Sequence, residues 1–282
     1  MTRRTLVSTL AATAAASSLR SAQAPAKARL RQSSTLGCFG KEIRADLDGL
    51  CKVAVKVGFK GLDLVGPKEF PTMKKYGLVP TMIYGTRSIP DGINRTEFHD
   101  LCEKQVREGI AQAVAEGGPN VILLAGNRRG MPDEQAIENS VAFINRVKAE
   151  AEDKGVTLCL ELLNSKVNHK DYQADRTSYG VEICKRANSP RARLLYDIYH
   201  MQIMEGDIIR TIRDNIQWIG HFHTAGNPGR NELSPTQELN YRPICQAIVD
   251  TGYTGWLAHE FSPRGDALAG LEEAFRVCDV GG

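Results

Sequence analysis

The chain has 282 residues, of which 42% are hydrophobic, so it can bury a sizeable core as two ordinary domains or as one large α/β barrel. Its formal net charge is +3, and part of that charge comes from basic residues before Leu30, so the rest of the chain is close to neutral. This composition excludes extensive disorder and gives no electrostatic support for nucleic-acid binding.

The first residues have the features of an export signal. Arg3 and Arg4 form a twin-arginine pattern, a weakly apolar Ala-rich run follows, and Ala22-Gln23-Ala24 is a small-residue cleavage site. We expect residues 1–24 to be a twin-arginine-type signal peptide, residues 25–33 to be a loose basic lead-in, and the mature protein to be periplasmic or otherwise exported. The alternative is a poorly ordered basic tail. No other run approaches the roughly 20 apolar residues of a membrane span.

From residue 34 onward, short apolar runs alternate with longer amphipathic runs. The predicted strands are 34–38, 61–65, 79–83, 120–124, 157–162, 193–197, 218–223 and 255–261. The predicted helices are 46–57, 69–76, 96–116, 133–153, 179–187, 207–214, 241–250 and 266–278. Glycines such as Gly117 and Gly155 stand where helices should end. Eight β-then-α units without a break in composition predict a single (β/α)₈ TIM barrel over residues 34–282.

Four of the predicted strands end in an acid or a histidine. Asp197 ends one strand and has His200 three residues further on, while Glu161, His223 and Glu260 end three others. Barrel enzymes build their sites at the carboxyl ends of the strands. Because side chains alternate along a strand, these four can all face the barrel interior. We therefore expect them to converge at the top of the barrel.

Two glutamates, one aspartate and one imidazole make an oxygen-rich site that suits Mn²⁺ or Mg²⁺, with Co²⁺ or Zn²⁺ also possible. Such a metal could bind two substrate oxygens and stabilise an enediolate. Carboxylates on either side of the substrate can remove and return a proton, as aldose–ketose isomerisation or epimerisation requires. Each residue also has an ordinary alternative. Glu161 or Asp197 alone could be a helix cap or ion-pair partner, and either His221 or His223 could be a core residue.

Six motifs between Leu160 and Gly265 carry a family resemblance. They are Leu160-Glu161-Leu162-Leu163-Asn164, Tyr196-Asp197-Ile198-Tyr199-His200-Met201-Gln202, His221-Phe222-His223-Thr224-Ala225-Gly226, Leu239-Asn240-Tyr241, Gly252-Tyr253-Thr254-Gly255-Trp256 and Glu260-Phe261-Ser262-Pro263-Arg264-Gly265. Together they resemble the hydroxypyruvate isomerase family of the xylose-isomerase-like TIM barrels, which also contains tagatose and psicose 3-epimerases.

The resemblance implies that Glu161 and Glu260 are the catalytic, proton-transferring pair. It implies a metal shared by the four strand-end residues Glu161, Asp197, His223 and Glu260. It also implies that His200 contacts a substrate hydroxyl, the alternative being a surface histidine in the following loop.

Arg230 matches the basic residue that faces the substrate in this family, and its guanidinium could hold a carboxylate through paired hydrogen bonds. The alternative is a solvated loop arginine. Asp63, at the end of the second predicted strand, is expected either to contact the substrate or to cap the next helix.

The expected function is that of an exported, metal-dependent isomerase acting on a small hydroxy-keto acid or sugar. The leading reaction is hydroxypyruvate to tartronate semialdehyde through an enediolate. A ketose 3-epimerase is one alternative, and a non-catalytic periplasmic sugar-binding protein is another. The outer helices of the barrel could support a homo-oligomer.

Overall fold

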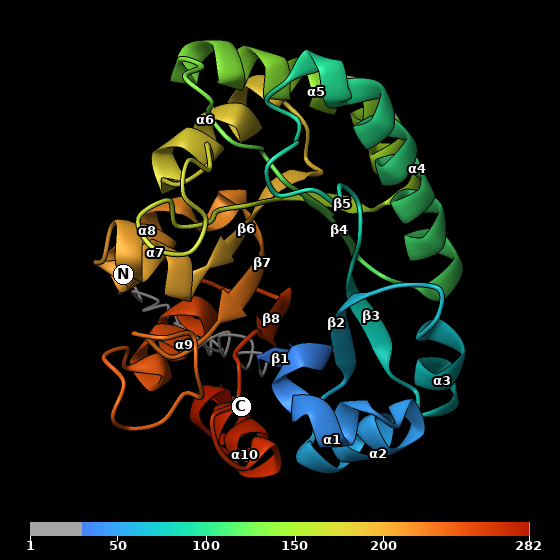
Figure 1. The fold of residues 1–282 in the computed structure, drawn as a ribbon, viewed down its shortest axis with the longest axis vertical. Helices are drawn as coiled ribbons and strands as arrows, with labels where there is room; N and C mark the ends of the chain where they lie inside the picture. Colours follow the sequence, from blue (N-terminus) through green and yellow to red (C-terminus); the bar gives the residue numbers. More distant parts are fainter. Residues whose placement is uncertain (1–29, 282) are drawn as a thin grey trace, which may run out of the picture.

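The computed structural model describes residues 30–281, which form a closed barrel of eight parallel strands with helices around it (Figure 1). The strands follow one another around the barrel in chain order, and β1 closes it by pairing with β8. The predicted single (β/α)₈ architecture is therefore confirmed. The predicted signal peptide, residues 1–24, lies outside the described residues.

The strands are β1 (Arg31–Thr35), β2 (Gly61–Val65), β3 (Val79–Ile83), β4 (Asn120–Leu123), β5 (Thr157–Glu161), β6 (Ala192–Asp197), β7 (Ile219–Thr224) and β8 (Trp256–His259). The α-helices are α1 (Gly40–Arg44), α2 (Leu47–Val57), α3 (Phe70–Lys75), α4 (His99–Glu116), α5 (Asp133–Lys154), α6 (Thr177–Ala187), α7 (Ile198–Met204), α8 (Ile208–Asn215), α9 (Tyr241–Asp250) and α10 (Ala267–Cys278). Three short 3₁₀ helices are η1 (Leu36–Phe39), η2 (Thr96–Phe98) and η3 (Ile216–Trp218).

The first strand is the element for which the sequence prediction was wrong. It begins at Arg31, three residues before the predicted start, and residues 36–39 form η1 instead of continuing the strand. Residues 31–33 are therefore part of the barrel and not of a loose lead-in. The strand is polar but buried because its side chains find partners inside the fold. Gln32 Nε2 donates to the Phe275 carbonyl at 3.1 Å, and the hydroxyl oxygens of Ser33 and Thr81 are 2.9 Å apart, within hydrogen-bond distance.

Two boundaries near the top of the barrel also differ from the prediction. The helix α7 begins directly after Asp197, whose carboxylate accepts a hydrogen bond from the His200 backbone N–H at 3.2 Å and so caps the helix. The strand β8 ends at His259, so Glu260 is the first residue beyond the strand. Both changes are local, because the order and direction of the strands are as expected.

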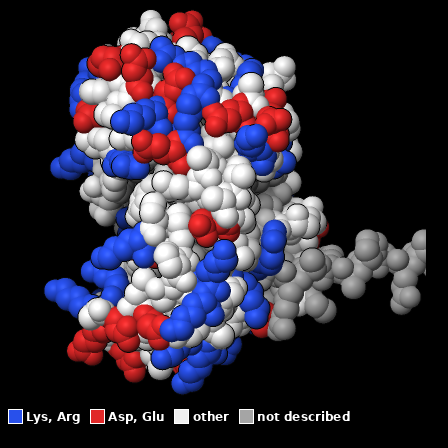
Figure 2. All heavy atoms as spheres, turned by 90° about the vertical axis from the view of Figure 1, so that its right-hand side faces the viewer, with Lys and Arg blue, Asp and Glu red and all other residues white. Residues whose placement is uncertain are grey.

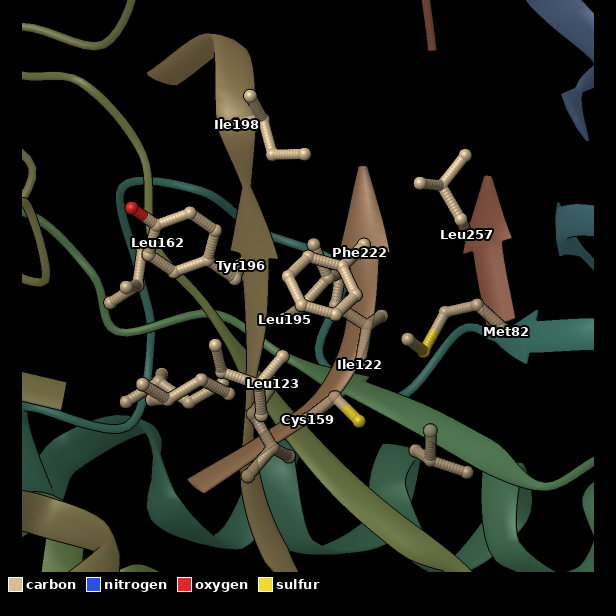
Figure 3. Close-up of a cluster of buried hydrophobic side chains, with 14 of the residues drawn as sticks. Met82, Ile122, Leu123, Cys159, Leu162, Leu195, Tyr196, Ile198, Phe222 and Leu257 are labelled. Atoms are coloured by element: carbon tan, nitrogen blue, oxygen red, sulfur yellow. The ribbon is translucent and has the colours of Figure 1, made fainter. Parts of the chain in front are cut away.

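The core consists of apolar side chains between the strands and the surrounding helices (Figure 3). Tyr196 on β6 and Phe222 on β7 lie side by side, with ring centroids 6.0 Å apart and the planes inclined by 68°. Phe222 also packs edge-on against Tyr253, with a centroid distance of 5.0 Å. Aromatic pairs in this geometry add to the stabilisation from burial alone. This packing fixes neighbouring strands whose upper ends carry Asp197 and His223.

Acidic and basic side chains are intermixed over the upper part of the face shown in Figure 2. Within α4, Arg107 pairs with Glu103 at 2.8 Å, and between α5 and α4, Arg146 pairs with Asp100 at 2.8 Å. Exposed pairs of this kind contribute at most about 1 kcal/mol each, so they balance charge more than they hold the fold. Among residues 30–281, no helix combines the length and apolar character needed to cross a bilayer.

Replacing Phe222 with alanine should lower the free energy of unfolding by about 3–5 kcal/mol, because the ring is fully buried and its removal leaves a cavity. Urea unfolding followed by circular dichroism would measure the loss. Leu101→Ala, at a side chain that is 56% exposed on α4, is the control and should change the value by less than about 0.5 kcal/mol. Equal effects of the two substitutions would contradict the packing described.

Candidate active site

Four side chains meet at the carboxyl ends of β5 to β8. Glu161, Asp197, His223 and Glu260 each offer a ligand atom, and these atoms all lie within 4.8 Å of one another. His223 Nδ1 is 2.9 Å from Glu260 Oε2 and 3.5 Å from Glu161 Oε1. The structure thus brings together the four residues that the sequence predicted to share a metal. Strand alternation explains this for Glu161, Asp197 and His223, which point inward from their strands, and Glu260 continues the inward-facing register of Trp256 and Ala258 one residue beyond β8.

Asp63 on β2 holds the other side of His223 from across the barrel interior. Its Oδ2 lies 2.8 Å from His223 Nε2, and its Oδ1 lies 3.1 Å from His221 Nε2. The hydroxyl of Thr81 donates to the same Oδ1. Burial opposes ionisation of this carboxylate, but His221 and His223 outweigh burial and hold the pKa of Asp63 below its usual range.

Asp63 therefore has neither of the two roles expected from the sequence. It is fully buried beneath the site, and the helix that follows, α3, is preceded by Glu69 at its N-cap position. The sequence did not decide between a functional and a core role for His221. This histidine lies in the same buried layer as Asp63, where Asn120 Nδ2 is 3.3 Å from its Nδ1. Burial lowers the pKa of His221, which favours a neutral ring. Both residues position His223.

The four residues Glu161, Asp197, His223 and Glu260, called the upper cluster below, concentrate negative charge in a buried volume. Burial raises the pKa of Asp197 to about 7, with Arg230 opposing and Glu260 adding to the rise. Burial also raises the pKa of Glu161. Burial alone would raise the pKa of Glu260, but the positive charges of Arg230 and His223 outweigh burial and lower it to about 2. Burial alone would lower the pKa of His223, yet the surrounding carboxylates raise it well above its ordinary value. The cluster is a site that favours a cation.

Arg230, in the loop after β7, lies beside this cluster and is not a solvated loop arginine. Its Nη2 is 2.7 Å from Glu260 Oε2 and 3.8 Å from Asp197 Oδ2, and its guanidinium lies over the ring of Tyr199 at 5.8 Å. The backbone of Arg230 has a φ of 57°, an uncommon conformation for a residue with a side chain. This conformation turns the side chain toward the barrel top, and its contact with substrate stays a prediction.

His200 is fully buried on α7 and is not a surface histidine. Asn164 Oδ1 accepts hydrogen bonds from the backbone N–H groups of Val167 and Asn168, so the Asn164 amide must direct its Nδ2 toward His200 Nδ1, 2.5 Å away. Burial, reinforced by Arg230, lowers the pKa of His200 well below its ordinary value. The neutral ring then carries its proton on Nε2, which lies 3.6 Å from Asp197 Oδ2 and has no hydrogen-bond partner within residues 30–281.

The donor set fits a divalent cation. Three carboxylates and one imidazole suit Mn²⁺ or Mg²⁺, and zinc or cobalt is also compatible with this set. A histidine that binds a metal usually gives its second nitrogen to a carboxylate or carbonyl, as His223 does to Asp63. The residues that would hold the ion are Glu161, Asp197, His223 and Glu260.

Comparison with known proteins places the chain in a family. The sequence model described as "Xylose isomerase-like TIM barrel" matches residues 72–279. The chain belongs to this xylose isomerase-like TIM barrel family. The resemblance drawn from the six motifs is therefore confirmed at the level of the family.

Several curated relatives carry isomerase names. A human protein provisionally named hydroxypyruvate isomerase is 33% identical over 174 residues, covering 58% of this chain and 63% of its own length. The hydroxypyruvate isomerase of Escherichia coli is 26% identical over 77% of this chain and 88% of its own length. The 2-oxo-tetronate isomerase of Cupriavidus necator is 36% identical over 48% of this chain and 50% of its own length. The chain thus spans less than two thirds of the human protein that it matches.

Solved structures agree on the fold. The AP endonuclease, family 2, from Brucella melitensis superposes with a TM-score of 0.77 at 22% identity, covering 86% of this chain and 96% of its own. The D-psicose 3-epimerase of Clostridium cellulolyticum superposes with a TM-score of 0.74 at 18% identity, covering 89% of this chain and 100% of its own. At these identities the likeness concerns the barrel alone.

Asp63→Asn should weaken Mn²⁺ binding by about 10- to 100-fold, because a neutral amide removes the negative charge beside His223 and no longer fixes the orientation of its ring. Isothermal titration of the metal-stripped protein would measure the dissociation constant. Asp48→Asn, at a carboxylate on α2 that bonds Lys75, is the control and should bind Mn²⁺ as the unmodified chain does. Unchanged affinity in Asp63→Asn would remove Asp63 from the site.

Proposed function

We propose that the protein is a metal-dependent isomerase that moves a carbonyl between adjacent carbons of a small hydroxy-keto acid. Hydroxypyruvate to tartronate semialdehyde is the leading reaction. The observation that carries the proposal is the convergence of two glutamates, Glu161 and Glu260, on one cation-favouring cluster. The names of the human and E. coli relatives support the choice of substrate.

In the proposed reaction, one glutamate takes a proton from the carbon that bears the hydroxyl group. The electrons of that C–H bond form the enediolate, and the other glutamate delivers a proton to the neighbouring carbon, where the carbonyl stood. The proton of the substrate hydroxyl passes to the neighbouring oxygen, so that atoms and charge balance. A bound divalent ion supplies electrostatic stabilisation of the negative charge that develops on the substrate oxygens. Glu161 and Glu260 perform general acid–base catalysis in this scheme.

Two further side chains orient the substrate. In this scheme the Arg230 guanidinium exchanges its contact with Glu260 for paired hydrogen bonds that it donates to the substrate carboxylate, which favours a keto acid over a free ketose. The Nε2 proton of His200 is placed to donate to a substrate hydroxyl. His200 is fully buried and Arg230 is 24% exposed, so water competes less for these contacts than it would at the surface.

A four-carbon acid is the second candidate substrate. The relative from Cupriavidus necator is named a 2-oxo-tetronate isomerase, and its reaction would use the same pair of carboxylates. Free ketoses, the substrates of a 3-epimerase, lack the carboxylate for which Arg230 is placed. Comparing hydroxypyruvate, a 2-oxo-tetronate and fructose, with and without EDTA, would separate these possibilities.

Glu161→Gln and Glu260→Gln should each lower kcat by about 10²–10⁴-fold, because glutamine can neither take nor give the proton. Proton NMR in deuterated water would follow both turnover and deuterium incorporation beside the carbonyl. Circular dichroism would check that each variant is folded. Glu138→Gln, at an exposed glutamate on α5, is the matched control and should retain the activity of the unmodified chain. Near-normal turnover in either site variant would refute the two-carboxylate scheme.

We also propose that residues 1–24 direct export by a twin-arginine pathway, on the basis of Arg3 and Arg4. Changing both to lysine should leave the protein in the cytoplasm of a bacterial host that has this pathway. Cell fractionation and immunoblotting would show where the protein accumulates. Export at the normal level would count against a twin-arginine signal.

A further inference from the structure

The cavity that opens beside the cluster is larger than a three-carbon acid requires. Its volume is about 680 Å³, and it runs from Glu260 and Arg230 to the segments that follow β1, β2 and β3. Cavities of about 300–1,000 Å³ are typical of sites for drug-sized ligands. Hydroxypyruvate bound at the cluster would therefore leave most of this space to solvent, so the cavity has room for a longer substrate.

The wall of the cavity at β2 is built at a cost in backbone strain. Leu64 has a φ of 50°, and the pairing of β2 with β3 shifts register on both sides of Asp63. Such irregularities re-aim side chains and are retained mainly near functional sites. Here the result is that Leu64 lines the cavity together with Tyr84, an aromatic side chain that remains 44% exposed. This wall offers contacts to carbon atoms that the reaction itself does not need.

Two cations line the same cavity away from the cluster. Arg44 ends α1 and Lys68 lies between β2 and α3; both are exposed. Neither forms an ion pair or a hydrogen bond through its side chain with any other residue between 30 and 281, whereas Arg230 is already paired with Glu260. Glu69, next to Lys68 in the chain, also lines the cavity, and one of its carboxylate oxygens accepts a hydrogen bond from the Gly66 backbone N–H at 3.0 Å. An anionic group in this part of the cavity would meet two cations.

We propose that the site also takes a sugar acid longer than three carbons, which carries a second anionic group, a phosphate or a carboxylate, at the end remote from the reacting carbonyl. Arg44 and Lys68 bind that group, and Leu64 and Tyr84 contact the carbons in between. This inference rests on the proposed function for one point, the placing of the reacting end at Glu260. The two cations and the apolar wall are independent of the reaction type.

The test uses compounds with one common 2-oxo acid end and a different far end: a hydroxyl group, a phosphate or a carboxylate. Values of kcat/KM would be measured for the unmodified protein and for Arg44→Ala/Lys68→Ala, and dissociation constants for both would be measured by isothermal titration. The unmodified protein should favour an anionic far end by on the order of tenfold, and the double variant should reduce that ratio to about one. The phosphate-ended or carboxylate-ended compound that is favoured more strongly over the hydroxyl-ended compound identifies the anionic group that the site binds.

Two further variants sharpen the test. Arg44→Glu/Lys68→Glu should reverse the preference, so that the hydroxyl-ended compound binds best. Lys56→Ala/Lys60→Ala removes two exposed lysines near the amino end of β2, outside the cavity lining, and should keep the tenfold ratio. Equal binding of charged and uncharged far ends by the unmodified protein would overturn the inference, as would a ratio that survives in the Arg44→Ala/Lys68→Ala protein. Because binding is measured separately, a lack of turnover on every compound would count against the proposed reaction and not against this subsite.

Discussion

The arrangement of the site depends on one buried carboxylate. Asp63 bridges His221 and His223 from across the barrel interior, with all three side chains fully buried. An unpaired charge at that depth would be too costly, so burying Asp63 requires both imidazoles to be where they are. His223 consequently has one nitrogen fixed from below and directs the other toward Glu161 and Glu260. The geometry of the upper cluster is set by a contact in the layer beneath it.

The upper cluster differs, because it holds more carboxylates than cations. Three carboxylates share the space, and the nearby cations are Arg230 and a protonated His223. Burial and this crowding raise the pKa of Asp197 to about 7, so protonation relieves part of the negative charge. A divalent cation would take the place of those protons, so the cluster is suited to binding one.

The sequence was sufficient to predict the barrel and the meeting of its four strand-end residues, because both follow from alternation along single strands. It was insufficient wherever a partner lies far away in the chain. Asp63 and His223 are 160 positions apart, so nothing local marks Asp63 as a support for that histidine. The start of the polar strand β1 was placed three residues too late for a similar reason, since Gln32 is satisfied by Phe275 at the other end of the chain. His200 was taken for a possible loop residue because its helix is only seven residues long.

The two halves of the barrel top differ in chemistry, and this difference separates reaction from recognition. The ends of β5 to β8 carry the buried acids and His223, whose positions are over-determined by strand pairing and by Asp63. The segments after β1 to β3 carry exposed cations and an apolar wall, which no buried network constrains. Leu64 and Arg230, which line the cavity on opposite sides, both have the positive φ values that are uncommon for residues with side chains. A change in the segments after β1 to β3 would therefore alter which substrate fits, whereas a change at Asp63 would affect every substrate alike.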